Sequence, residues 1–226
     1  MHRKTNFPLW IAGLAVLVSS QLLADDWTQW RGNNRDGKST ETGLANSWPE
    51  AGPPLLWRTE DLGGGYSTPS SAGGVVFLIT NQGVSSEEVI ALSLADGSKL
   101  WSTEIGKVAA NQGPQYPGSR STPTIDGDKL YALGSDGDLA CLDKESGSLL
   151  WSKNLRSEFG GQPGKWAYSE SPLVDGEKLI CSPGGGQATV VALNKSDGSV
   201  IWKAALPEGD DASFSSPISA SIDGVE

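Results

Sequence analysis

The chain has 226 residues, of which 17 are lysine or arginine and 27 are aspartate or glutamate, so its formal net charge is −10. This acidic balance argues against nucleic acid as a partner, because binding to phosphates requires basic patches. The single histidine is His2. Once the N-terminal segment described next is removed, no histidine is left for a catalytic triad or a metal site.

The N-terminus is predicted to be a secretory signal peptide covering residues 1–24. Arg3 and Lys4 give it a basic start, and the uncharged apolar run Leu9–Val18 is too short to span a bilayer. We expect cleavage after Ala24, with an earlier cut and an uncleaved anchor as alternatives. Cleavage removes two basic residues and leaves a net charge of −12. The mature chain is then exported to the periplasm or the extracellular space, with no membrane insertion.

A pattern of 11 residues occurs three times in the chain. Each copy begins with a small residue, carries glycine at its seventh position and ends on tryptophan. The copies are Ala91–Trp101, Cys141–Trp151 and Ala192–Trp202, with glycines Gly97, Gly147 and Gly198. A second element, a serine-containing stretch that ends in proline, precedes each copy and occurs once more after the last, with prolines Pro69, Pro123, Pro172 and Pro217.

Each repeat is predicted to form four short antiparallel strands separated by glycine turns. In the middle repeat we expect these strands at residues 121–125, 129–133, 139–142 and 149–152. Four-stranded units repeated every 45–54 residues are typical of a β-propeller, whose blades pack face to face around a channel. The sequence therefore predicts an all-β propeller domain over residues 55–226, preceded by an N-terminal extension at residues 25–54.

The repeated glycine and tryptophan are interpreted as structural residues. Glycine supplies the positive φ that a tight turn demands. The large apolar ring of Trp101, Trp151 or Trp202 is expected to pack against a neighbouring blade, because it recurs at one position of the repeat. A role in stacking on a cofactor is the alternative.

These motifs resemble the tryptophan-docking motif of the quinoprotein (PQQ-like) β-propeller repeat family. The family includes PQQ-dependent dehydrogenases, BamB-like outer-membrane assembly propellers and secreted bacterial propellers, whose N-terminal start the segment Trp27–Gly37 resembles. The resemblance implies seven or eight blades in the complete protein. The sequence holds three whole blades and partial ones, so we expect a C-terminally truncated chain in which Leu55–Trp57 completes a blade that is absent here.

Two functions fit the resemblance. The first is a non-catalytic binding or protein-assembly scaffold, with no catalytic residue, metal or cofactor. The alternative is a PQQ- and Ca²⁺-dependent alcohol or sugar dehydrogenase whose catalytic residues lie partly beyond residue 226. The scaffold is favoured because the chain has no adjacent cysteines and its acids fall mostly in turns, where turn formation explains them. Cys141 and Cys181 are expected to be buried thiols, with a disulfide between them as the alternative.

A binding site for a protein or a small polar ligand is expected on the blade face with long loops. Loops at residues 80–87, 107–119, 156–169 and 182–188 are predicted for that face, opposite uniform short turns. Arg120 and Glu170 interrupt positions that other repeats fill with aromatic or hydroxyl side chains, and we expect them to pair or to grip a ligand together. The candidate residues of this face are Tyr66, Tyr116, Arg120, Trp166, Tyr168, Glu170 and Phe214.

Overall fold

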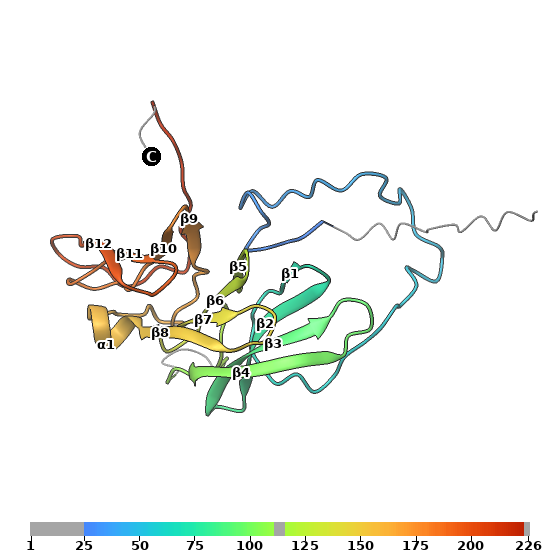
Figure 1. Cartoon of the computed structure of the whole chain (residues 1–226), viewed down its shortest axis with the longest axis horizontal. Helices are drawn as coiled ribbons and strands as arrows, with labels where there is room; N and C mark the ends of the chain where they lie inside the picture. Colours follow the sequence, from blue (N-terminus) through green and yellow to red (C-terminus); the bar gives the residue numbers. More distant parts are fainter. Residues whose placement is uncertain (1–24, 111–115, 224–226) are drawn as a thin grey trace, which may run out of the picture.

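The computed structural model describes residues 25–110 and 116–223, and the predicted signal peptide lies outside these ranges. The described residues form three antiparallel sheets of four strands (Figure 1), here called blades 1 to 3. Blade 1 comprises β1 (Ser70–Ala72), β2 (Val75–Gln82), β3 (Ser86–Ser93) and β4 (Lys99–Lys107). Blade 2 comprises β5 (Thr124–Asp126), β6 (Lys129–Leu133), β7 (Asp138–Asp143) and β8 (Leu149–Asn154). Blade 3 comprises β9 (Leu173–Asp175), β10 (Lys178–Cys181), β11 (Val190–Asn194) and β12 (Val200–Ala204).

The strands of each blade pair in chain order, so the predicted four-stranded antiparallel blades are confirmed. The short inner strands β1, β5 and β9 contact one another in sequence. A single helical turn, α1 (Leu155–Phe159), follows blade 2 and is capped by the side chain of Asn154. No helix in the described residues has the length and apolar character that crossing a membrane requires.

Two apolar cores lie between the blades. Phe77, Ile79 and Val89 of blade 1 pack against blade 2, whereas Tyr131 of blade 2 packs against Leu179 of blade 3. Each fully buried side chain of this size contributes about 1.5–3 kcal/mol to folding. Thus every blade is stabilised through its neighbour.

Cys141 and Cys181 both lie in the core between blades 2 and 3 as free thiols. The predicted buried thiols are therefore confirmed, and the alternative of a disulfide is wrong. Burial raises the pKa of the Cys141 thiol to about 11 and that of Cys181 well above its ordinary value.

The repeated tryptophan rings cover the turn glycines of the next blade. A Cβ added to Gly97 would lie 2.5 Å from the Trp57 ring, one added to Gly147 would lie 2.6 Å from Trp101, and one added to Gly198 would lie 2.9 Å from Trp151. Hydrogen bonds fix two of the rings: Trp57 Nε1 donates to Leu94 O (2.8 Å), and Trp151 Nε1 donates to Lys195 O (3.2 Å). The rings of Trp101 and Trp151 thus pack on the following blade, and the ring of Trp57 packs on blade 1 in the same way.

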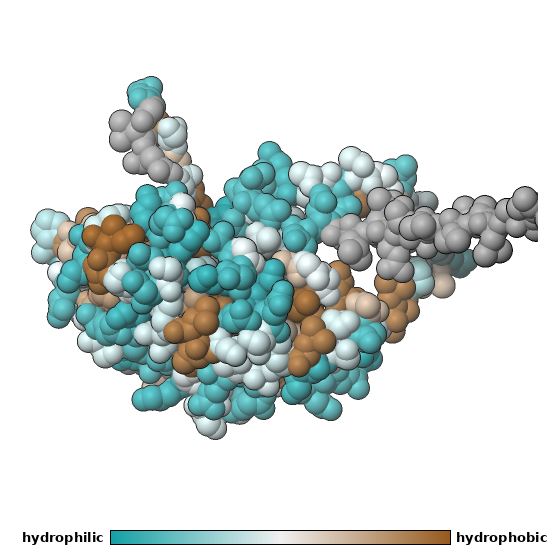
Figure 2. All heavy atoms as spheres, viewed as in Figure 1, coloured by the Kyte–Doolittle hydropathy of each residue, from teal (hydrophilic) through white to brown (hydrophobic). Residues whose placement is uncertain are grey.

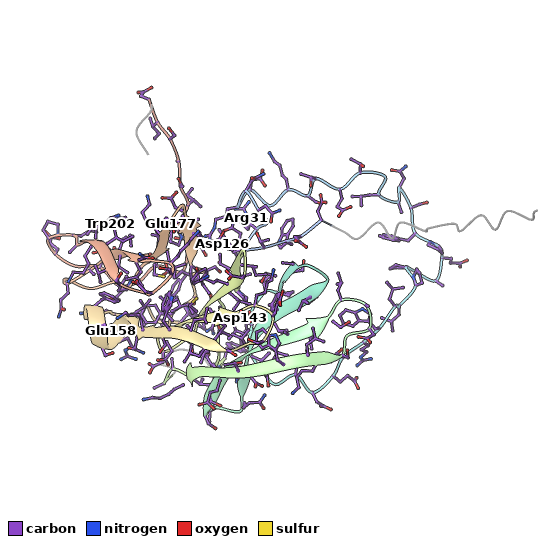
Figure 3. The ribbon with its side chains drawn as sticks, viewed as in Figure 1. Arg31, Asp126, Asp143, Glu158, Glu177 and Trp202 are labelled. Carbon is purple, nitrogen blue, oxygen red and sulfur yellow. The ribbon has the colours of Figure 1, made fainter. Side chains whose placement is uncertain are left out.

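Trp202 occupies the same position of β12, which is the last strand of the described chain and lies at the edge of the sheets in Figure 3. Its side chain is 40% exposed, because no further blade follows it in the described residues. Apolar residues that begin the outer strands are also exposed; they are Leu100, Leu149, Leu150, Val200 and Ile201. On the face seen in Figure 2, apolar groups are separated by hydrophilic ones.

A β-bulge stands directly before each repeated tryptophan. The register shifts between Ala91 and Leu92 in blade 1, and at the same place in blades 2 and 3. The extra residue re-aims the side chain that follows it. The residue paired with tryptophan across the strands is Ala91, Cys141 or Ala192. The small first residue of the repeat is therefore the one that lies opposite the large ring.

Hydrogen bonds inside the turns account for the acidic residues that precede the repeated glycines by one residue, as Asp96 and Asp197 do, or by four, as Asp143 does. The carboxylate of Asp143, for example, accepts from the backbone N–H (2.8 Å) and the hydroxyl (2.7 Å) of Ser146. These bonds lower the pKa of Asp143, and equivalent bonds from serine lower those of Asp96 and Asp197. The glycine that follows has φ between +71° and +73° in all three turns, which favours glycine.

The serine-proline element joins the inner strands of successive blades. Ser67 Oγ donates to Ser121 O (2.7 Å), which links blade 1 to blade 2. Ser171 Oγ accepts from Thr122 N (2.9 Å), and Ser216 Oγ accepts from Ser171 N (2.8 Å). The second repeated element therefore supplies a hydroxyl seam along the inner wall.

Residues 26–37, here called the inner strap, run along the inner strands of all three blades. Trp27 forms an antiparallel bridge with Ser71 of β1, and Thr28 O accepts from Ile125 N of β5 (2.8 Å). Arg35 is buried and donates to Ser171 O, to Pro172 O and to Pro217 O (2.7 Å for the last). Arg31 marks this segment in Figure 3. Part of the segment expected as an N-terminal extension thus lines the propeller.

Glu87 of β3 is a fully buried acid at the boundary between blades 1 and 2. Its Oε2 accepts from Ser135 N (2.6 Å), whereas its Oε1 has no hydrogen-bond partner among the described residues. Burial raises its pKa to about 7; the bonds from Ser135 oppose this rise, and the nearby Asp138 and Asp136 add to it. The folded protein therefore holds a proton here at a pH where the unfolded chain releases it.

We predict that docking of tryptophan makes Gly147 more sensitive to substitution than Gly127. Both have positive φ, but a Cβ on Gly127 would meet nothing within 4 Å. Gly127→Ala should cost only the left-handed strain, about 1–2 kcal/mol. Gly147→Ala should cost about 1–3 kcal/mol more, because the Trp101 ring must move. Denaturant midpoints of the two variants measure this difference, and equal midpoints would refute the docking.

The buried Glu87 predicts a stability that falls as the pH rises. A folded pKa of about 7 against 4.5 unfolded means that the stabilising proton is lost as the pH increases through 7. We expect Glu87→Gln to reduce the loss of unfolding free energy between pH 5 and pH 8 by about 1–3 kcal/mol. Urea melts at both pH values test this. The exposed Glu145→Gln is the matched control and should change the pH dependence little.

Candidate functional site

The short turns and the long connections lie on opposite faces of the blades. One backbone hydrogen bond joins the two short turns of each blade, as from Lys144 N to Asp128 O (2.8 Å). On the same face Lys195 Nζ forms ion pairs with Asp126 (2.7 Å) of blade 2 and Glu177 (3.6 Å) of blade 3; Figure 3 labels both acids.

The predicted long loop at residues 80–87 is wrong. Strands β2 and β3 extend through it as one hairpin and leave only residues 83–85 between them. The other three long connections are found in the described residues: residues 108–110 and 116–123 lie between blades 1 and 2, residues 155–172 join blades 2 and 3, and residues 182–189 join β10 to β11.

Four of the seven candidate residues gather in one recess on the long-connection face. Tyr66, Tyr116, Arg120 and Trp166 line a cavity of about 350 Å³, here called the Arg120 recess. The rings of Tyr66 and Tyr116 meet edge to face, with centroids 5.8 Å apart. The guanidinium carbon of Arg120 lies 5.4 Å from the centroid of Tyr66 and 5.7 Å from that of Trp166. The connection before each of the three blades contributes at least one of these residues.

Backbone carbonyls hold the Arg120 guanidinium in place. Nη1 donates to Gly118 O (3.2 Å) and to Trp166 O (3.1 Å), and Nη2 donates to Tyr116 O (2.7 Å). All three acceptors are neutral. Within the described residues no salt bridge reaches Arg120, so its charge is half-buried without a carboxylate partner. Such a cation is a ready site for an anion.

Close packing of backbone supports the recess from below. Tyr66 N donates to Ser119 O (2.9 Å), which ties the first connection to the second. A Cβ added to Gly118 would lie 3.2 Å from the Cα of Gly65 and would overlap the side chain of Asn81. Asn81 is itself buried. The loops that carry Tyr66 and Arg120 are therefore held as one packed unit.

The expected pairing of Arg120 with Glu170 is wrong. Glu170 is fully buried, and its Oε1 accepts from Ser182 N. In blade 1 the hydroxyl of Ser67 accepts from the equivalent Ile79 N (3.2 Å). Glu170 therefore accepts the hydrogen bond that the serine accepts in blade 1. Its charge also interacts with Arg35 of the inner strap. Burial raises its pKa to about 7, and Arg35 opposes the rise.

Tyr168 and Phe214 also lie away from the recess. Tyr168 is buried in the core between blades 2 and 3, and its hydroxyl donates to Pro183 O (2.8 Å). Phe214 is 51% exposed and packs near Gly164. Phe214 occupies the repeat position of Tyr66 and Arg120, and Tyr168 lies in an adjacent loop, but the repeat fixes the strand and not the course of the connection before it.

Three residues near these sites carry no signal in the repeat. Lys165 Nζ lies 6.0 Å from the centroid of Trp166 and adds a second cation beside the recess. Asn81 supports the recess, and Arg35 compensates Glu170. The carbonyls of Ser171 and Pro217 that Arg35 binds are so far along the chain that no local pattern could reveal its burial. The sequence marks only the segment that contains it, residues 27–37, by its resemblance to the start of secreted bacterial propellers.

Comparisons with known proteins agree on the family. A family model described as outer membrane protein assembly factor BamB matches residues 40–162 and 85–226. The BamB of Xanthomonas campestris pv. campestris is 34% identical over 110 residues, which are 48% of this chain and 25% of that protein. The quinohemoprotein alcohol dehydrogenase ADH IIB of Pseudomonas putida is 29% identical over 153 residues, which are 65% of this chain and 21% of that protein.

Among solved structures, the quinohemoprotein alcohol dehydrogenase ADHIIG of Pseudomonas putida HK5 has a TM-score of 0.56 at 19% identity. It covers 78% of this chain, which spans 26% of that protein, and the likeness shows the propeller fold alone. The chain therefore matches about a quarter of the length of these proteins or less. The family model covers most of the residues of this chain. The chain therefore belongs to the family of PQQ-like repeat propellers whose model is described as outer membrane protein assembly factor BamB.

Proposed function

We propose that the protein is an exported, non-catalytic β-propeller that acts as a binding or assembly scaffold. Its partner is a protein or a small polar ligand, and it binds on the long-connection face at the Arg120 recess. The observation that carries this proposal is the gathering of Tyr66, Tyr116, Arg120 and Trp166 from separate blade connections into one recess. Tyrosine, tryptophan and arginine are the residues that most often dominate the energy of protein interfaces.

The relatives support the scaffold in general terms. The BamB proteins are named assembly factors, and a rigid propeller that presents variable connections suits such a role. Export rests on the predicted signal peptide, and the exported chain would work in the periplasm or outside the cell.

A quinoprotein dehydrogenase is the second candidate, favoured by the likeness to ADH IIB. Calcium takes six to eight oxygen ligands, largely carboxylates and carbonyls. In residues 25–110 and 116–223, no group of three or more His, Cys, Asp or Glu side chains is placed to hold a metal ion. The buried carboxylate of Glu170 faces the cation Arg35 instead. We therefore place the dehydrogenase second to the scaffold.

We predict that partner capture depends on the recess. The double replacement Tyr116→Ala with Arg120→Ala should leave the melting midpoint within a few degrees of the parent, because both side chains lie on connections. It should, however, abolish most of the protein retained from the periplasmic fraction of the source organism in a pull-down, quantified by mass spectrometry.

Asp128→Ala with Glu177→Ala on the short-turn face is the control. The side chains of these acids are 76% and 82% exposed, so the variant should fold and should retain the same partners. If this variant loses them while the recess variant keeps them, the binding face is the opposite one and the proposal fails.

The non-catalytic proposal predicts no alcohol oxidation. The protein, incubated with PQQ and Ca²⁺, should reduce an electron-accepting dye no faster with ethanol or glucose than without substrate. Spectrophotometric dye reduction measures this. Substrate-dependent reduction that a calcium chelator abolishes would overturn the scaffold in favour of the dehydrogenase.

A further inference from the structure

The Arg120 recess restricts the chemistry of what it binds. We infer that it takes a carboxylate carried beside an aromatic side chain in a polypeptide, that is, an acidic-aromatic segment of a partner protein. This inference rests on the proposed function and names the partner chemistry of the same site. The arrangement of charge, hydrogen-bond donors and rings in the recess supports it.

The charge of Arg120 favours an anion as the ligand. Its three hydrogen bonds end on neutral carbonyls, and no carboxylate of the described chain forms a salt bridge with it. The protein as a whole is acidic, with a net charge of −10. An ion pair formed with this half-buried cation would be less screened by solvent than one on the surface.

The donors of Arg120 that are left over suit a carboxylate. A guanidinium has five N–H donors, and the bonds to Gly118, Trp166 and Tyr116 use two on Nη1 and one on Nη2. Within the described residues, Nε–H and one N–H of Nη2 have no acceptor. Two neighbouring N–H groups match the two oxygens of a carboxylate. The carbonyls and the flanking rings already fix the side chain, so binding loses little side-chain entropy.

The walls of the recess suit an aromatic side chain rather than a sugar. Arg120 is the only residue of the lining whose side chain is charged, and the other three, Tyr66, Tyr116 and Trp166, are aromatic. A sugar needs several converging polar groups to satisfy its hydroxyls, and this lining has no amide or carboxylate side chain. Edge-to-face contacts with the rings would favour an aromatic ligand.

The exposure of the rim points to a segment of a larger partner. Tyr66 is 53% exposed and Tyr116 is 52% exposed, so parts of both residues stay open to solvent. A small molecule would cover little of these faces, whereas a chain that continues beyond the recess can cover them. Lys165, on the Trp166 side, extends the positive field in the direction of such a chain.

Two blocked tripeptides test the inference: acetyl-Phe-Asp-Phe-amide and its Asn counterpart, titrated by calorimetry at low ionic strength. The Asp peptide should bind about tenfold more tightly, as expected for a charge-assisted bond to a held guanidinium. Arg120→Met should reduce that ratio to about one, and Arg120→Lys should lower it while keeping some preference. Tyr116→Ala should weaken both peptides together and leave the ratio unchanged. Arg58→Met, at an exposed arginine, is the control and should behave as the parent.

Several results would overturn the inference. Equal binding of the Asp and Asn peptides by the parent is one, and it requires no variant to fold. A preference for Asp that survives Arg120→Met is another. Benzoate that binds as tightly as the Asp peptide would show a site for small acids instead of a polypeptide. If the recess variant loses the partner in the pull-down while the parent binds the Asp and Asn peptides equally, the proposed scaffold function stands and only the inferred recognition of a carboxylate fails.

Discussion

The fold depends on one contact, the docking of a tryptophan ring on a glycine of the next blade. The contact fixes several positions together. The turn needs glycine both for its positive φ and because a Cβ would enter the ring. A bulge directs the tryptophan, and a small residue pairs opposite it. Since the same contact joins blade 1 to blade 2 and blade 2 to blade 3, each blade is held in a fixed relation to the next.

That rigidity explains why the candidate site lies where it does. Docking, the hydroxyl seam and the two cores hold the strands and the short turns, so those parts of the blades are alike. The connections on the other face share only single residues with these contacts, such as Tyr168 in the core between blades 2 and 3 and Ser171 in the hydroxyl seam, and they differ in length and sequence. The Arg120 recess is built from such connections, and the fixed spacing of the blades brings its four side chains to one place.

The sequence predicts the blades well because their determinants are local and repeated. Gly147 and Trp151 lie within one hairpin, and three copies confirm each other. The recess is predicted in part: the face and four side chains are found. The role of Glu170 is not predicted. A glutamate at a position that other repeats fill with serine looks, in the sequence, like an exposed functional residue. Its charge interacts with Arg35, whose bonds to Ser171 O and Pro217 O join residues 136 and 182 positions apart in the chain.

The inner strap also has a consequence for the order in which the chain folds. Its residues are made early, yet Arg35 binds carbonyls 136 to 182 residues later, just before blade 3 and after it. Closing so long a loop has a high entropic cost until the intervening blades have formed and brought its ends together. We therefore expect the Arg35 end of the strap to dock only after the third blade has formed, whereas the Trp27 end can pair with β1 as soon as the first blade exists.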